Sequence, residues 1–111
     1  MKIKTSELSG IALDWAVMSI EKPKNSLDWF IKYRDQTTFA YSTNWGLGGV
    51  IIERERLNNE YDSDADFWFC SYERGEVAFG RTGETPLIAA MRCYVASKLG
   101  DTVEVPDELT V

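Results

Sequence analysis

Apolar side chains recur every three or four positions near the start of the chain, which is the spacing of one face of a helix. They stand at Leu8, Ile11, Ala12, Trp15 and Ala16. The pattern predicts a helix over about residues 6–21, with Thr5 or Ser6 as its N-cap. Pro23 cannot continue a helix and marks the end of this one.

A second amphipathic stretch, near the C-terminus, has start and stop signals as well. Thr85 is a good N-cap, and Pro86 suits the first position of a helix, where no N–H is needed. Apolar residues then follow along one face: Leu87, Ala90, Met91, Tyr94, Val95 and Leu99. With Gly100 as the stop, these signals predict a helix over about residues 85–99.

The stretch DFWFCSYE, residues 66–73, gives the strongest strand signal. Because aromatic side chains occupy both of its faces, the pattern predicts a central strand that is covered on both sides. Residues 74–76 then make a tight turn, and residues 77–79 return as the second strand of a hairpin. Short edge strands are expected at residues 1–4 and 103–105.

The middle of the chain is less regular. Residues 27–33 suit either a strand or a helix, residues 39–41 have strand character, and residues 50–52 suit a short strand or a buried helical turn. Residues 58–66 are predicted to form a polar, acidic loop. The sum is an α+β fold, in which residues 1–111 form one domain with a small antiparallel sheet packed with two main helices.

The chain is acidic, with 18 Asp and Glu against 12 Lys and Arg and a net charge of −6. Binding to nucleic-acid phosphates needs a basic surface, so we expect no direct contact with nucleic acid. An acidic surface can instead meet a basic protein. No stretch approaches the roughly 18 consecutive apolar residues of a membrane span, and no signal-peptide pattern follows the first residues. We therefore expect a cytosolic protein without membrane contact.

The chain contains no histidine, which excludes the usual Ser-His and Cys-His nucleophiles and histidine-based zinc sites. Cys70 and Cys93 are expected to pack inside a strand and a helix as reduced thiols. A carboxylate pair could be drawn from Asp14, Glu53 and Glu55, but nothing in their spacing specifies one. We expect no enzyme activity and no cofactor.

An acidic skeleton similar to a calcium loop occurs between the middle and the hairpin. Counting from Asp62 as position 1, acids stand at the positions 3, 5 and 12 that an EF-hand uses: Asp64, Asp66 and Glu73. Position 6, where the sharp turn needs glycine, is Phe67. An acidic loop that enters a strand is therefore favoured, and no metal site is predicted.

The stretch YSTNWGLGGVIIERE, residues 41–55, has two interpretations. Successive glycine N–H groups can form a nest for an anion, aromatic rings can stack a base, and hydroxyl and amide groups can orient it. Alternatively, the polar residues satisfy the backbone of an ordinary turn. The chemistry of these residues alone favours the turn.

If this stretch folds onto the last helix, residues at the start of that helix join a ligand site. Thr85 is expected to act mainly as a cap there, since Pro86 lacks an N–H and Glu84 adds negative charge. The candidate ligand-binding residues are Tyr41, Ser42, Thr43, Asn44, Trp45, Gly48, Gly49, Thr82 and Thr85.

Three blocks of the chain, KTSELSGIALDWAV, YSTNWGLGGVIIERE and TPLIAAMRCYVASKLGDTVEVPDEL, resemble the NinX family of small proteins from lambdoid phages and prophages. A weaker likeness, of architecture only, is to the phage ABA-sandwich proteins. The chain departs from the family pattern at Asn44, where the family has Asp, and at Val50, where it has Pro. A catalytic role that depends on a carboxylate at position 44 is therefore disfavoured.

The resemblance implies a phage or prophage accessory protein in the cytoplasm of a bacterial host, without an established activity. The leading hypothesis is a non-enzymatic binder of a small nucleotide-like ligand, which could sequester a signal of host defence. The alternative is a module that modulates a host protein through the acidic surface. Strands at Ile3 or Val103 could also pair between two chains of a homodimer.

Overall fold

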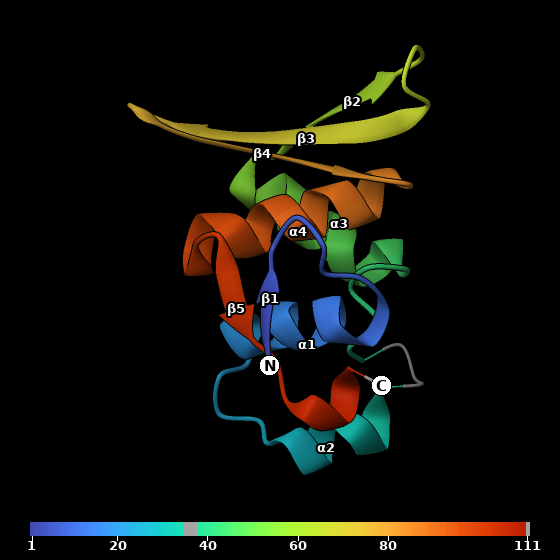
Figure 1. The fold of residues 1–111 in the computed structure, drawn as a ribbon, viewed down its shortest axis with the longest axis vertical. Coiled ribbons are helices and arrows are strands. Elements are labelled where there is room, and N and C mark those ends of the chain that lie inside the picture. The colour runs from blue at the N-terminus through green and yellow to red at the C-terminus, as the bar shows by residue number, and fades with distance from the viewer. Residues whose placement is uncertain (35–37, 111) are drawn as a thin grey trace.

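The helices and strands stack in layers along the long axis of the molecule (Figure 1). The structure, a computed structural model, describes residues 1–34 and 38–110. In chain order the elements are β1 (Lys2–Lys4), α1 (Gly10–Glu21), α2 (Leu27–Tyr33), α3 (Trp45–Glu55), β2 (Asn58–Asp62), β3 (Phe67–Arg74), β4 (Val77–Gly83), α4 (Pro86–Leu99), β5 (Thr102–Glu104) and η1 (Asp107–Leu109). The predicted α+β class is confirmed.

A three-stranded antiparallel sheet, in the order β2-β3-β4, forms one end of the molecule (Figure 1). The predicted hairpin is confirmed, with Gly75 at a φ of 61° between β3 and β4. The polar loop predicted at residues 58–66 is wrong for its first half, because Asn58–Asp62 pair with β3 as strand β2. The sequence of this segment lacks an alternating pattern, so its strand conformation results from pairing with β3 and not from an intrinsic preference for the strand conformation.

Only one face of the sheet is covered. Cys70 in β3 is fully buried and pairs with Asn59 and Arg81, so this row of side chains points toward α4. The opposite face, called here the open face, comprises Asn58, Glu60, Asp62, Phe67, Phe69, Ser71, Glu73, Ala78, Gly80 and Thr82. None of the ten is buried. β3 is central, as predicted, but its aromatic residues at odd positions are not covered by a second layer within the described residues.

Helix α4 lies at the centre of the fold, and its predicted boundaries are confirmed. The Thr85 side chain accepts a hydrogen bond from the Ile88 N–H at 3.1 Å, Pro86 is the first helical residue, and Gly100 follows the last. Eight of its fourteen residues are buried, because the sheet lies on one side and α1 and α3 on others. A helix enclosed this way depends on packing more than on helix propensity.

Helix α1 begins at Gly10, later than the predicted position near residue 6. Residues 2–4 and 102–104 pair as the separate sheet β1-β5, and the Thr5 N–H then donates to the Asp101 carbonyl at 2.8 Å. Thr5 is thus fully buried and extends the strand connection instead of capping a helix. The strand predicted near Val103 pairs with β1 and does not join the larger sheet.

Residues 27–33, for which two conformations were open, form helix α2, whose N-cap Ser26 accepts from the Trp29 N–H. The strand character predicted for residues 39–41 is wrong, since these residues lie in turns. Phe39 is fully buried, with its ring centroid 5.6 Å from that of Phe30. Burial against α2 therefore explains the apolar pattern that suggested a strand.

Candidate functional site

A groove of about 210 Å³ lies where the first turns of α3 and α4 come together. The segment before α3 and the start of α3 form one wall, and the start of α4 forms the other. The lining residues are Ser42, Thr43, Trp45, Thr85, Leu87 and Ile88. None of these six side chains carries a charge. We call this feature the α3–α4 groove.

The turn predicted across residues 41–49 is wrong for its second half, because α3 begins at Trp45. Asn44 is the N-cap: its side-chain oxygen accepts from the Gly46 N–H at 2.8 Å, and its carbonyl accepts from Leu47 and Gly48. The Gly46 and Gly48 N–H groups are therefore used within the helix and its cap, so the anion nest, the less favoured of the two interpretations, does not form. Asn and Asp cap helices about equally well, so the neutral residue at position 44 suits this role.

Gly48 lets α3 approach α4 closely. A Cβ atom at this position would stand 2.5 Å from Leu87 Cδ1 and 2.5 Å from the Tyr41 carbonyl oxygen. At Gly49, a Cβ would meet the Trp45 ring at 3.5 Å, an ordinary contact. Gly48 is thus required by packing, whereas Gly49 lies beside the Trp45 indole.

Trp45 is the aromatic residue among the six that line the groove, and 55% of its surface is accessible. As the first residue of α3, it has a fixed backbone, and its ring contacts the Gly49 position one turn later. An indole held in this way presents a flat surface for stacking.

Tyr41 and Ser42 are both buried, and only Ser42 lines the groove. Burial raises the pKa of Tyr41 to about 12, so the phenol stays neutral, and its position in the core does not fit the predicted stacking role. The Ser42 N–H donates to Asp14 Oδ1 of α1 at 2.8 Å. Desolvation raises the pKa of Asp14 against the opposing effect of these hydrogen bonds from Ser42.

Thr82, the remaining candidate, lies away from the groove on the open face, opposite Phe69. Its carbonyl accepts from Arg92 Nη1 at 2.8 Å, and Arg92 Nε donates to the Leu8 carbonyl. The structure therefore brings Ser42, Thr43, Trp45 and Thr85 together and separates them from Thr82. The sequence did not identify Leu87 and Ile88 as walls, because a helical pattern does not show which neighbour a residue faces.

A charged network that the sequence did not predict joins the last turns of α1, α3 and α4. Arg54 donates to both Glu21 oxygens, at 2.9 and 2.8 Å, and to Glu55 at 3.0 Å. The Tyr94 hydroxyl donates to Glu21, and Lys98 pairs with Glu55 at 3.3 Å. The Arg54 hydrogen bond lowers the pKa of Glu21, and Arg54 and Lys98 lower that of Glu55 despite its desolvation.

The three acids from which a carboxylate pair could be drawn have different surroundings. Glu55 belongs to this network, Asp14 accepts from Ser42, and Glu53 is exposed on α3. The calcium-like skeleton is used in the β2–β3 hairpin, where Asp62 Oδ1 accepts from the Asp64 and Ala65 N–H groups. Within residues 1–34 and 38–110, no group of three or more potential ligands is arranged to hold a metal ion.

Cys70 and Cys93 face each other between β3 and α4, and both are buried free thiols, as predicted. The neighbouring Cys93 thiol and burial raise the pKa of Cys70, which stays protonated. These thiols lie inside the core and are not among the residues that line the groove.

Comparison with known families identifies the chain's relationship. The model of the family described as bacteriophage P22 NinX matches residues 4–98. The chain belongs to the NinX family. The match spans α1 to α4 and includes every residue that lines the α3–α4 groove. No curated protein matches this NinX-family chain.

The NinX-family assignment makes the chain a phage accessory protein. Among the helices of the described residues, none combines the length and apolarity needed to cross a membrane.

Proposed function

We propose that this NinX-family protein acts by binding rather than by catalysis, and that the α3–α4 groove takes the flat ring of a nucleotide-like ligand. The observation that supports this most is the half-exposed Trp45 ring at the wall of a concave surface. Stacking of a base on an aromatic side chain contributes roughly 1–3 kcal/mol. A core tryptophan would be buried, whereas Trp45 is half exposed and borders a concave surface that a ring can enter.

Hydroxyl groups around the Trp45 ring can orient the ligand. Thr43 is exposed at the groove, and Thr85 accepts from the Ile88 N–H while its own hydroxyl hydrogen remains available to donate. Leu87 and Ile88 supply the apolar floor that a ring needs on its second side. A few oriented polar groups on an apolar surface are typical of small-molecule sites.

The size and charge of the groove narrow the ligand. Pockets that enclose a drug-sized molecule measure roughly 300–1,000 Å³, so a groove of about 210 Å³ accommodates a base-sized ring. A sugar and phosphate would remain outside, near the N-terminal ends of two helices that have no acid in their first turns, although Glu84 stands directly before the N-cap of α4. Helix N-termini favour negative charge, so this arrangement suits a nucleotide better than a cationic ring.

In an infected bacterium, a protein of this kind would sequester a nucleotide signal of host defence. It would need to be abundant, because a shallow groove gives a modest affinity.

Thermal shift measurements with a panel of nucleosides, nucleotides and cyclic nucleotides test the proposal. We expect at least one to raise the melting temperature of the wild-type protein, and Trp45→Ala to abolish the shift. Thr43→Tyr should also abolish it, because a ring at this exposed wall would fill the groove.

Trp29→Ala is the matched control, since Trp29 is 48% exposed on α2 and does not line the groove. This variant should keep the full shift. A shift retained in Trp45→Ala, or no shift with any compound of the panel, would refute the proposed site.

A further inference from the structure

The open face of the three-stranded sheet is strongly acidic. It holds Glu60, Asp62 and Glu73, and no Lys or Arg is among its ten residues. Residues 58–84 contain seven Asp or Glu and two Arg, a net charge of −5 out of −6 for the whole chain. The negative charge of the protein is therefore concentrated in the sheet and its connections.

The two arginines of this region are used on the covered side. Arg81 donates to Thr5 and pairs with Asp101 at 3.2 Å. Arg74 donates to the Glu55 carbonyl and lies over the Tyr72 ring, 4.6 Å from its centroid. Neither guanidinium neutralises the open face.

A hollow of about 320 Å³ lies on this face between two carboxylates and an aromatic ring. Glu60, Tyr61, Asp62, Ser63 and Phe69 line it. Within the described part of the chain, neither Glu60 nor Asp62 forms an ion pair. Asp62 is held in place because its Oδ1 accepts two N–H groups of the hairpin turn.

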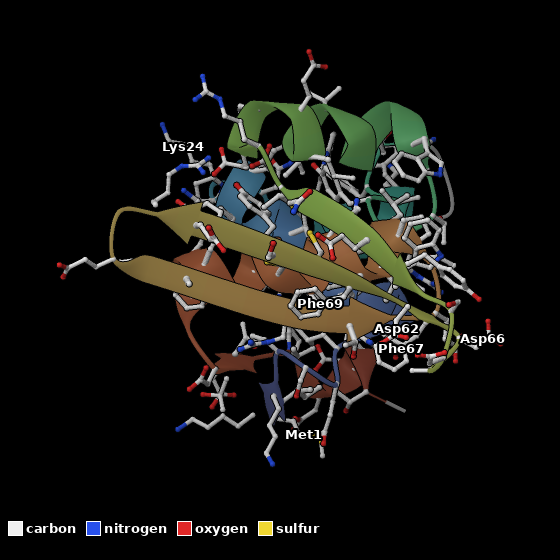
Figure 2. All side chains as sticks on the ribbon, turned by 90° about the horizontal axis from the view of Figure 1, so that it is seen from above. Met1, Lys24, Asp62, Asp66, Phe67 and Phe69 are labelled. Atoms are coloured by element: carbon white, nitrogen blue, oxygen red, sulfur yellow. The ribbon has the colours of Figure 1, made fainter. Side chains whose placement is uncertain are left out.

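Phe69 lies flat across the middle of the open face, as Figure 2 shows from above. The absence of a side chain at Gly80 makes this possible, since a Cβ there would stand 2.6 Å from Phe69 Cζ. The ring is 38% exposed and borders the hollow. A cation that enters the hollow would meet both the ring face and the carboxylates, two favourable contacts for Arg or Lys.

We propose that the open face docks a basic segment of another protein, which places an Arg or Lys side chain in the Glu60–Asp62 hollow and an apolar side chain on Phe69. A second copy of this chain would bring acid against acid, and nucleic acid would be repelled by the same charge. The docking surface is separate from the α3–α4 groove, so either proposal can fail without the other.

Titration of the ¹⁵N-labelled protein with synthetic peptides tests this proposal. One peptide alternates arginine and leucine, a second contains lysine and glycine only, and a third alternates glutamate and leucine. We expect the first to shift the amide signals of the open face, the second to bind at least threefold more weakly, and the third to cause no shift.

Three variants should weaken binding of the arginine–leucine peptide by roughly three- to thirtyfold, the range that one cation–π contact or charge contact supplies. Phe69→Ala removes the ring, Asp62→Asn removes a charge but keeps the turn acceptor, and Gly80→Val displaces the Phe69 ring. Glu108→Lys, a charge reversal on an exposed residue of η1, should leave binding unchanged apart from a small loss of long-range attraction to the cationic peptide.

Two outcomes would overturn the proposal. One is equal binding of the arginine–leucine and lysine–glycine peptides with no effect of Phe69→Ala, which would mean unspecific charge attraction. The other is a homodimer in sedimentation experiments that Asp62→Asn strengthens or Phe69→Ala dissolves, which would make a second copy the occupant of the open face. Melting temperatures of the variants show that each remains folded.

Discussion

The two ends of the helix pair α3 and α4 differ in chemistry. Their first turns meet at a groove without charge, where Trp45 is half exposed. Their last turns meet in the network of Arg54, Glu55 and Lys98, to which α1 contributes Glu21. The helices thus run side by side in the same direction, with a surface groove over their first turns and ion pairs between their last turns.

This difference separates a structural role from a binding role. In the network at the charged end, Glu21 and Glu55 each have a cationic partner, so these groups satisfy one another and leave little for a ligand. At the groove, the exposed indole and the Thr43 side chain have solvent as their neighbour. Polar and aromatic side chains that face solvent, and whose backbone is held by a helix, are available to bind a ligand.

The largest effect is expected where the two helices approach most closely. Gly48→Ala should lower the free energy of unfolding by about 2–3 kcal/mol, because its methyl group would overlap Leu87 and the Tyr41 carbonyl. Denaturation with urea measures this loss.

Gly49→Ala is the matched comparison on the next residue. There the methyl group meets only the Trp45 ring at 3.5 Å, so higher helix propensity should raise stability by about 0.5–1 kcal/mol. Equal effects of the two substitutions would contradict the close approach of α3 to α4.

A smaller loss is expected at the charged end. Glu21→Gln breaks the paired hydrogen bonds from Arg54 and should cost about 1–2 kcal/mol at pH 7, allowing for solvent screening of this partly exposed pair. Ligand binding at the groove should be unchanged. Glu53→Gln, on the exposed side of α3, is the control and should have little effect.

The pH dependence of this loss has a definite sign. Arg54 lowers the pKa of Glu21 below 4.5 in the folded protein, so the stabilisation is complete above that value and disappears as the pH falls through the folded pKa. The wild-type protein and Glu21→Gln should therefore converge in acid. A constant difference between them at all pH values would mean that the ion pair is not responsible.

The smallest effect is expected at Asp14, behind the groove. Desolvation raises its pKa above 3.8, so its ionisation opposes folding as the pH rises through the folded pKa. Asp14→Asn keeps an acceptor for the Ser42 N–H without the charge and should be neutral or stabilising by up to about 1 kcal/mol at pH 7. Asp14→Ala leaves this N–H without its acceptor and should be destabilising, as urea denaturation would show.

The sequence predicted the elements whose signals are local. Helix α4 has its cap, its Pro86 and its Gly100 within the segment itself, and the β3–β4 hairpin has Gly75 at the turn. The first part of helix α3, up to residue 49, was predicted as a turn because of its polar residues and glycines, and residues 50–52 were left open between a strand and a helical turn. Three glycines in four positions also disfavour a helix. The contact between Gly48 and Leu87 reverses that preference, and it is a contact between distant segments.

The candidate site was predicted only in part, because some of its residues are positioned by contacts between distant segments. Polar and aromatic residues at 42–45 marked one wall of the groove, and Thr85 marked the start of the other. Which of the two faces of β4 holds Thr82 depends on the register with β3, and Tyr41 is buried by residues far away in the chain. Patterns within a segment do not contain this information.

The most direct test of the binding role is titration of the ¹⁵N-labelled protein with adenosine monophosphate and with cyclic nucleotides. The account predicts that the Trp45 indole signal and the amide signals of Thr43, Thr85 and Ile88 shift together. The amide signals of Arg54 and Lys98, at the other end of the helices, should not shift. Shifts that centre on the charged end, or no shift at millimolar concentrations of every nucleotide, would contradict it.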